Sequence, residues 1–340
     1  MPEEPQVEAA SGQHPGSPAR RRLMLLLRVA VSLALLAYLV LVTVPPADRA
    51  KIVAIYARCD LLYLLAAICL TFLDRLLSGW KWLMLLRARQ PGMEAGPVMQ
   101  VFFVSTFLGY FLPSSIGGDA IRIFSLSRLN RDLAGSTSSV VLDRAFGTLG
   151  LLGIAAVALL PAVGSAVSLA DASIIWTLTV GALVGVLVLS SRTCNAWALR
   201  LIGPDRQGPI GRRLLRLVES FRGFVERKWI LVRVFLFSLA VQVIRVLIVL
   251  FLGISLRFEV DPVVYFIYVP IITVITFLPI SVAGVGVREA AFLFFFTQVG
   301  LPAYACISLS LLYFSMGIVA TLPGAAVYAL SGFARRKAQA

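Results

Sequence analysis

The sequence is poor in the residues that metal centres and many active sites depend on. Its 340 residues contain a single histidine, His14, which lies in a polar N-terminal stretch. There are four cysteines, without Cys-x-x-Cys spacing: Cys59, Cys69, Cys194 and Cys306. Imidazoles and thiolates are the usual protein ligands of zinc, haem and iron–sulfur clusters. We therefore expect no metal, no cofactor and no histidine-based catalysis.

Charged residues are also scarce. They make up 14% of the chain, against 59% hydrophobic residues, and the mean hydropathy is +0.90. Soluble domains carry about 25% charged residues, so this composition excludes a soluble globular protein and indicates a polytopic membrane protein. The net charge of +14 comes from basic residues in short loops between apolar runs. Membrane topology and anionic lipid headgroups explain that pattern better than nucleic-acid binding does.

Apolar runs predict an all-α polytopic fold with about six full transmembrane helices. Each run is near or above the roughly 20 residues that a bilayer requires. The predicted spans are 23–44, 61–86, 136–160, 172–190, 230–254 and 302–330. Two further apolar segments, 97–131 and 262–300, are interrupted by a Leu-Pro pair. Since proline breaks a helix, we interpret both as re-entrant helical hairpins.

Both interruptions carry the same string, Phe-Leu-Pro-x-Ser-x-x-Gly-x-x-x-Arg, at 111–122 and 277–288. The copies are 166 positions apart, and the same shift lays the 61–86 span onto 227–252. Each half thus contains three full spans and one hairpin. An odd number of crossings gives the halves opposite orientations, which predicts an inverted repeat.

The basic loops predict the orientation of the chain. Most Lys and Arg residues fall on the side of the N-terminus, and the positive-inside rule then places both termini in the cytoplasm, in the inner (cytoplasmic) membrane. The predicted organisation is a disordered cytoplasmic tail at 1–19, a first repeat at 20–165 with hairpin 97–131, a second repeat at 166–332 with hairpin 262–300 and a basic loop at 191–229, and a basic tail at 333–340. The basic loop resembles an amphipathic interfacial helix, although a solvated topology anchor is an equal alternative.

The first hairpin contains a candidate anion site. A helix restarting after a break leaves backbone amides unpaired, and glycines allow a ligand to approach them. The residues of this break are Pro113, Ser115, Gly117 and Gly118. Asp119 and Arg122 follow on one helix face, where they either pair locally or point together into a cavity. The alternative role of Asp119 is that of a helix-start carboxylate that satisfies the free amides.

The second hairpin repeats the break with different acidic chemistry. Its break residues are Pro279, Ser281, Gly284 and Gly286. Arg288 matches Arg122, but the carboxylate here is Glu289, one residue after the arginine. Amides, helix dipole and guanidinium together favour a phosphate at both breaks.

Ionisable residues inside the predicted spans add further candidates, because a charge at bilayer depth is costly and usually paired or functional. Asp143 and Arg144 are adjacent and should have different partners, whereas Gln242 and Arg245 share a helix face. Lys81 is interpreted mainly as a snorkelling residue, with Trp82 near the cytoplasmic interface. Asp74 and Arg75 lie in the same span as these two residues.

Three ordered motifs resemble the transmembrane region of lysylphosphatidylglycerol synthases, a family that includes stand-alone flippase-like membrane proteins. They are Leu-Pro-x-x-x-Gly-Gly-Asp-x-x-Arg at 112–122, Val-x-x-Asp-Arg-x-x-Gly at 140–147, and Leu-Pro-x-Ser-x-x-Gly-x-Gly-x-Arg-Glu at 278–289. The similarity covers about residues 22–332. It implies a role in moving or presenting anionic lipids or lipid-linked intermediates. Ala283 stands where the family commonly has glycine.

The resemblance does not imply synthase activity. The bifunctional members carry a soluble domain that charges the lipid, and the chain after the last predicted span leaves no room for it. We therefore expect a non-enzymatic protein that translocates an anionic phospholipid or a polyprenyl-phosphate-linked intermediate. Arg122, Arg288, Arg144 and Arg245 would hold the phosphate, while Asp119, Asp143 and Glu289 would neutralise them or couple transport to protons. The alternatives are a membrane-embedded transferase acting on a lipid phosphate, and a membrane partner that recruits a soluble lipid-modifying enzyme; a homo-oligomer is left open.

Overall fold

The computed structural model describes residues 34, 37–110, 112, 115–160, 169–191, 228–277 and 284–337. Within these ranges the chain forms helices and no strand. The elements are η1 (Leu39–Thr43), α2 (Pro46–Ala57), α3 (Leu61–Arg89), α4 (Ala95–Tyr110), α5 (Ser115–Asn130), α6 (Leu133–Leu159), α7 (Leu169–Ser190), α10 (Lys228–Ser255), α11 (Pro262–Thr276), α12 (Val287–Thr297), α13 (Ala303–Val319) and α14 (Leu322–Lys337). The all-α fold predicted from the sequence is confirmed.

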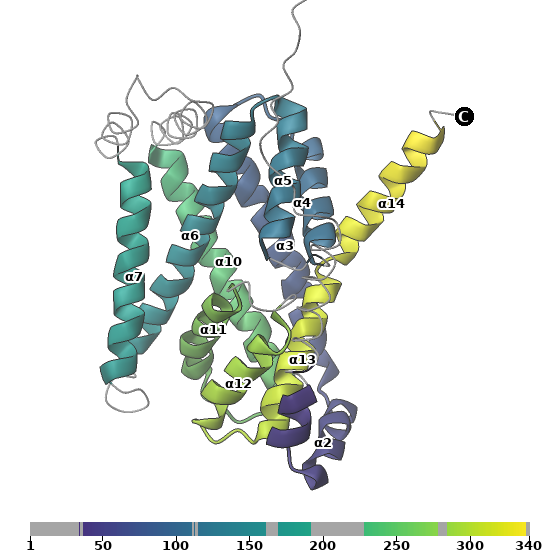
Figure 1. Cartoon of the computed structure of the whole chain (residues 1–340), viewed down its shortest axis with the longest axis vertical. Coiled ribbons are helices and arrows are strands. Elements are labelled where there is room, and N and C mark those ends of the chain that lie inside the picture. The colour runs from purple at the N-terminus through teal and green to yellow at the C-terminus, as the bar shows by residue number, and fades with distance from the viewer. Residues whose placement is uncertain are drawn as a thin grey trace, which may run out of the picture.

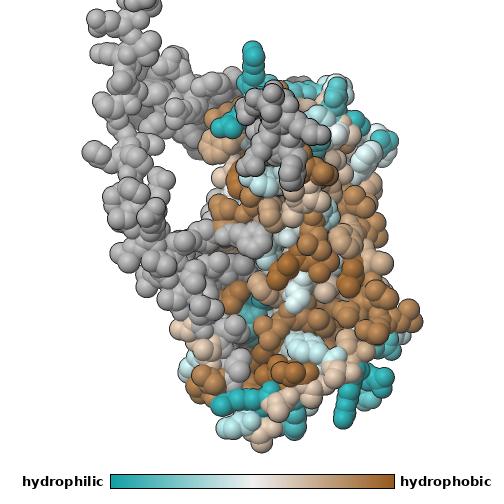
Figure 2. Space-filling view, turned by 90° about the vertical axis from the view of Figure 1, so that its right-hand side faces the viewer, coloured by the Kyte–Doolittle hydropathy of each residue, from teal (hydrophilic) through white to brown (hydrophobic). Residues whose placement is uncertain are grey.

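Four helical segments in the described part are long and apolar enough to cross a membrane. They are Leu61–Arg89, Leu133–Leu159, Trp229–Ser255 and Ala303–Leu330, which match four of the six predicted spans. Helix α7 occupies the range of a fifth. Most of the predicted first span, and nearly all of the basic loop 191–229, lie outside the described residues. Figure 2 shows that hydrophobic side chains cover the middle of one face, with hydrophilic ones gathered towards its ends.

The two halves of the chain contain corresponding helices. A shift of 166 residues carries α3 onto 227–255, where α10 runs, and α4 onto 261–276, where α11 runs. Helices α3 and α10 pack against each other. In Figure 1 they run in opposite directions, and the α4–α5 and α11–α12 hairpins enter from opposite ends, with their tips in the middle of the molecule. This arrangement agrees with the predicted inverted repeat.

Aspartates that precede three helices explain where those helices begin. Asp60 accepts a hydrogen bond from the Leu62 amide, and Asp132 accepts one from the Gly135 amide. Asp261 does the same for α11, which has Pro262 as its first residue. Such N-cap bonds satisfy amides that have no partner within the helix. Short polar residues in the loops thus fix the helix starts.

The tips of the two hairpins are built differently. In the first, Gly109 and Gly118 touch: a Cβ on Gly109 would lie 2.5 Å from the Gly118 Cα. These glycines therefore let α4 and α5 approach each other. In the second, Gly284 and Gly286 have φ angles of 76° and 85°, which favour glycine. The Glu289 carboxylate then accepts a hydrogen bond from the Gly286 amide at 2.6 Å and caps α12.

Candidate functional site

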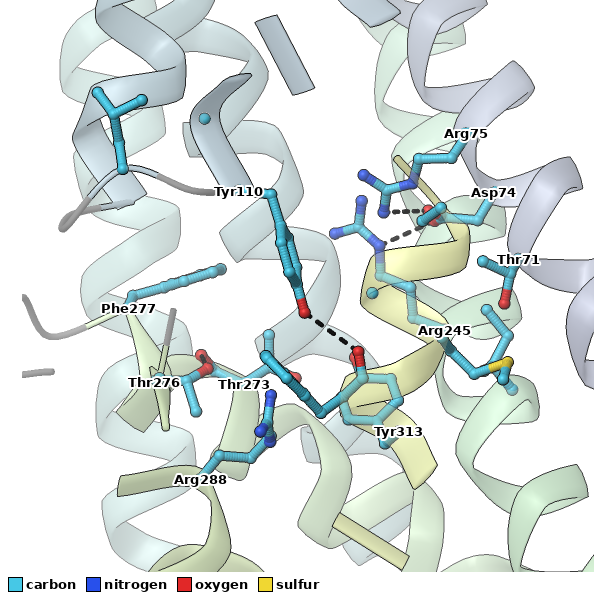
Figure 3. A pocket seen from close by; sticks show the side chains of 18 of the residues that line it. Thr71, Asp74, Arg75, Tyr110, Arg245, Thr273, Thr276, Phe277, Arg288 and Tyr313 are labelled. Atoms are coloured by element: carbon cyan, nitrogen blue, oxygen red, sulfur yellow. Dashed lines mark hydrogen bonds and ion pairs between the residues drawn. The ribbon is translucent and has the colours of Figure 1, made fainter. Parts of the chain in front are cut away.

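Two polar cavities adjoin each other at the hairpin tips. Cavity 1 has a volume of about 350 Å³ and cavity 2 of about 260 Å³. Six residues line both of them: Arg75, Gly109, Tyr110, Arg144, Arg245 and Phe277. In Figure 3, Tyr110 extends into cavity 1 opposite Arg75 and Arg245, with Arg288 on a further side. The cavities are thus two parts of one polar interior between the repeats.

Cavity 2 contains two cations that share one carboxylate. Arg122 Nη1 donates to Asp143 Oδ2 at 3.1 Å, and Lys81 Nζ lies 2.9 Å from Asp143 Oδ1. The side chains of Lys81 and Arg122 are 6% and 8% exposed. The Arg122 guanidinium also stacks on Trp82, 3.8 Å from the ring centroid. Stacking and one shared carboxylate hold Arg122 in the protein interior, away from bulk water.

A second pair connects the first hairpin to α6. Arg144 donates to both Asp119 oxygens, at 2.9 and 3.1 Å. This fork is the strong geometry of a guanidinium on a carboxylate. Arg144 also lies over the ring of Phe277, 5.8 Å from its centroid, at the tip of the other hairpin. Asp119, Arg144 and Phe277 therefore link the two repeats across the cavities.

A third cluster joins α3 to α10. Asp74, which is 1% exposed, accepts from Arg245 Nε at 2.8 Å and also pairs with Arg75. Arg245 makes longer bonds to Gln242 Oε1, at 3.4 Å, and to Ser78 Oγ, at 3.5 Å. The side chains of Arg75 and Arg245 are 24% and 27% exposed and reach the cavities. The predicted common face of Gln242 and Arg245 is confirmed.

Arg288 at the second hairpin is neutralised locally. Its Nη2 donates to Glu289 Oε1 at 2.6 Å, and its Nε donates to Ser310 Oγ at 3.2 Å. Ser310 in turn donates to Glu289. The guanidinium lies 4.7 Å from the centroid of the Phe314 ring. The two hairpin arginines are thus balanced in different ways, one by a carboxylate from another helix and one by its neighbour.

The interior carries more positive than negative charge. Six cations line the cavities: Arg75, Lys81, Arg122, Arg144, Arg245 and Arg288. Their partners are four carboxylates, those of Asp74, Asp119, Asp143 and Glu289. The formal excess is therefore two positive charges. Among the described residues, Arg75 Nε and Arg122 Nε and Nη2 are buried donors without a hydrogen-bond partner. These three atoms have almost no accessible surface, so an anionic oxygen would contact them only after neighbouring groups move.

The structure brings most of the predicted residues together. The four arginines, Asp119, Asp143, Gly118 and Gly284 line the cavities. Gly286 and Glu289 form the start of α12 behind Arg288. Gly117 lies against the Leu112 side chain. Pro113, Pro279, Ser281 and the side chain of Ser115 lie outside the described residues.

Several sequence interpretations need correction. Asp119 does not pair locally with Arg122 and does not cap a helix start, because Arg144 on α6 holds both of its oxygens. It does point into cavity 2 together with Arg122, which was the other alternative. Lys81 does not snorkel, since Asp143 holds it inside. Trp82 is fully buried against Arg122, so its ring faces neither lipid nor water.

Sequence reasoning missed the uncharged part of the lining. Tyr110, Thr273, Thr276 and Tyr313 line cavity 1, and Tyr110 Oη donates to the Phe314 carbonyl at 3.1 Å. The position of Tyr110, directly before the first Phe-Leu-Pro string, was the available signal. In the described ranges no group of three or more His, Cys, Asp or Glu side chains could hold a metal ion.

Comparison with known families gives one match. The model of the lysylphosphatidylglycerol synthase TM region matches residues 25–324, which is most of the chain. No curated protein and no solved structure matched. The match covers both hairpins, both cavities and every ion pair described above, so the chain belongs to the lysylphosphatidylglycerol synthase transmembrane-region family.

Proposed function

We propose that this protein is a flippase-like lipid transporter for an anionic phospholipid or a polyprenyl-phosphate-linked intermediate. The headgroup phosphate would enter the polar interior between the hairpin tips, while the hydrocarbon chains stay in the bilayer. The observation that carries the proposal is the excess of two positive charges in that interior. A phosphate diester supplies one negative charge towards that excess and oxygens that accept hydrogen bonds from guanidinium groups.

The surroundings of the cavities support a lipid as the ligand. Large apolar side chains are exposed on the outer faces of the spanning helices; examples are Leu65, Leu76, Val157 and Leu236. These faces suit hydrocarbon, whereas the interior carries charges that are costly in hydrocarbon. A molecule with a charged head and apolar chains matches both environments. A soluble anion would match only the interior.

The inverted repeat supports movement across the membrane. Sites at the interface of inverted repeats are typical of alternating-access transporters, because one half can rock against the other around a central site. Here the contacts between the halves at the cavities are polar: Asp74 with Arg245, and Tyr110 with the Phe314 carbonyl. Polar contacts can be exchanged for water or ligand contacts when the halves move. We further propose cytoplasmic termini in the inner membrane, from the basic loops, and no catalytic step.

The direct test is headgroup translocation in vesicles. The purified protein is reconstituted with tail-labelled fluorescent phosphatidylglycerol, and dithionite bleaches the label in the outer leaflet only. Protein-free vesicles should lose the half of their fluorescence that comes from the outer leaflet. Vesicles with the native protein should lose more than that half, because labelled lipid from the inner leaflet is moved outward. Arg122→Gln should slow this exchange at least tenfold, because one of the buried cations of cavity 2 is lost.

The matched control is Arg89→Gln. Arg89 also pairs with an aspartate, Asp132, at 3.0 Å, but it lines neither cavity. It should leave exchange unchanged. Exchange by a folded Arg122→Gln protein at the native rate would contradict the proposed role of Arg122. The lack of exchange by the native protein would contradict transport itself.

A further inference from the structure

The two cavities differ in their buried cations. Lys81 and Arg122 line cavity 2 and do not line cavity 1. Hydroxyl groups line both cavities, and those of cavity 1 come from Thr71, Tyr110, Thr273, Thr276 and Tyr313. Figure 3 shows the side chains of these five residues around the same space. Because the two extra cations of cavity 2 favour the anionic phosphate there, cavity 1 is left for another part of the same headgroup.

The threonine hydroxyls of cavity 1 can act only as acceptors towards a ligand in this conformation. Thr71 Oγ1 donates to the Ala67 carbonyl at 2.8 Å, and Thr273 Oγ1 to the Val269 carbonyl at 2.7 Å. Thr276 Oγ1 donates to the Thr273 carbonyl at 2.7 Å. Each proton is used within its helix, while lone pairs remain on the oxygen. A ligand group that binds these oxygens must therefore be a donor.

Lipid headgroups carry two kinds of hydrogen-bond donor, a hydroxyl and an ammonium. The charges around cavity 1 decide which of the two it can bind. Four arginines line it, against the single carboxylate of Asp74. When Asp119 and Glu289, the partners of Arg144 and Arg288, are included, one positive charge remains in excess. An ammonium would be repelled there, whereas an uncharged hydroxyl would not.

The aromatic lining suits the carbon skeleton of such a ligand. Phe277 and Phe314 line cavity 1 on the side of the second hairpin. Specific small-molecule sites combine apolar surface with a few placed polar groups, and cavity 1 has the size of the smaller ones. Hydroxyl acceptors, arginine donors and aromatic rings together match a polyol, whose hydroxyls both donate and accept and whose carbons are apolar.

We infer that cavity 1 binds the uncharged, hydroxyl-rich part of the lipid headgroup, such as glycerol, inositol or a sugar, while the phosphate lies at the arginines shared with cavity 2. This inference rests on the proposed function and narrows its substrate class. The expected substrates are phospholipids with a polyol headgroup, and headgroups that carry an ammonium should bind poorly. Lysylated phosphatidylglycerol, with its added amino groups, is therefore a poor substrate for this chain.

The test compares labelled lipids that share their tails. Phosphatidylglycerol and phosphatidylmethanol both carry one negative charge, but the second has no headgroup hydroxyl. The native protein in vesicles should prefer phosphatidylglycerol in competition, by about fivefold for each hydrogen bond gained. Phosphatidylethanolamine and lysylphosphatidylglycerol should exchange more slowly than either. Equal exchange of all four lipids, or faster exchange of the two ammonium lipids, would overturn the inference and leave transport intact.

A double variant ties the preference to the threonines. Thr273→Val/Thr276→Val keeps the side-chain shape and removes two acceptors. It should abolish the preference for phosphatidylglycerol over phosphatidylmethanol. Thr297→Val is the control, because Thr297 also donates to its own helix, to the Leu293 carbonyl at 2.7 Å, but is exposed outside the cavities. An unaltered preference in a folded double variant would refute the assignment, whereas no exchange of any lipid by the native protein would contradict the proposed function as well.

Discussion

The stability of the protein should depend unequally on Asp74 and Asp143, which each pair with two cations at the cavities. Asp143→Asn removes the carboxylate that holds both Lys81 and Arg122, whose side chains are 6% and 8% exposed. Removing one partner of a buried ion pair costs about 3–5 kcal/mol, because the other charge is left uncompensated. Here two cations are left, and neither reaches bulk water. We therefore expect the cost to lie at the upper end of that range.

Asp74→Asn also leaves two cations but should cost about half as much. Its partners Arg75 and Arg245 are 24% and 27% exposed, so water in the cavities can solvate them. Arg245 additionally keeps its bonds to Gln242 and Ser78. Asp74 is the more deeply buried of the two carboxylates. Its loss should nevertheless cost less stability, because its two arginine partners are more exposed than Lys81 and Arg122.

The assay is unfolding in detergent micelles by added SDS, followed by circular dichroism. The expected order of midpoints is native, then Asp74→Asn, then Asp143→Asn. Asp48→Asn is the reference for an exposed pair: Lys51 lies 2.6 Å from Asp48 but is 57% exposed, so the midpoint should barely change. An Asp143→Asn midpoint equal to that of Asp48→Asn, or above that of Asp74→Asn, would refute the reasoning.

Three further predictions concern single positions. Gly109→Ala should destabilise the first hairpin in the same SDS titration, because the new Cβ would lie 2.5 Å from the Gly118 backbone. Gly153→Ala is the control: its Cβ would meet nothing within 4 Å, so it should be neutral or stabilising by up to about 1 kcal/mol. Gly317→Ala should slow lipid exchange with little loss of stability, because its Cβ would lie 2.6 Å from the Tyr110 hydroxyl and displace it from the Phe314 carbonyl; exchange at the native rate would contradict this. Glu289→Gln should destabilise by about 2–4 kcal/mol, since it leaves Arg288 without its buried carboxylate, and an unchanged midpoint would show that Ser310 alone satisfies the arginine.

The sequence predicted the helices because local signals mark them. The hydrophobic runs have bilayer length, and the repeated string fixes the offset of 166 between the halves. Since the offset carries α3 onto α10 and α4 onto α11, the correspondence of the halves followed from one repeated motif. The opposite directions followed from the parity of crossings, which needs no knowledge of packing.

The partners within the site could not be predicted in the same way. Asp119 and Arg122 share a face of α5, so spacing alone favours a local pair. Arg144 on α6 nevertheless binds Asp119 with a fork that a residue three positions away on the same helix does not provide. Which helix supplies a partner depends on how α5 and α6 pack, and one sequence does not contain that information.

The position of Lys81 also depends on tertiary packing that the sequence does not reveal. Its long side chain near the end of a span suited snorkelling to the interface. The packing of α3 against α6 instead places Asp143 2.9 Å from its ammonium, in the protein interior. Trp82 is held inside with it by stacking on Arg122. A tertiary ion pair and a cation–π contact thus override the preference of both residues for the interface.

Photo-crosslinking at the cavity tests most directly whether a headgroup enters between the hairpin tips. A benzophenone amino acid replaces Phe277, which lines both cavities, or Phe294, which is 64% exposed on the outer face. After irradiation in vesicles of mixed lipids, mass spectrometry identifies the attached lipid. Anionic phospholipids should be enriched over the vesicle composition at 277 and not at 294. The same lipid composition at both positions would contradict the account.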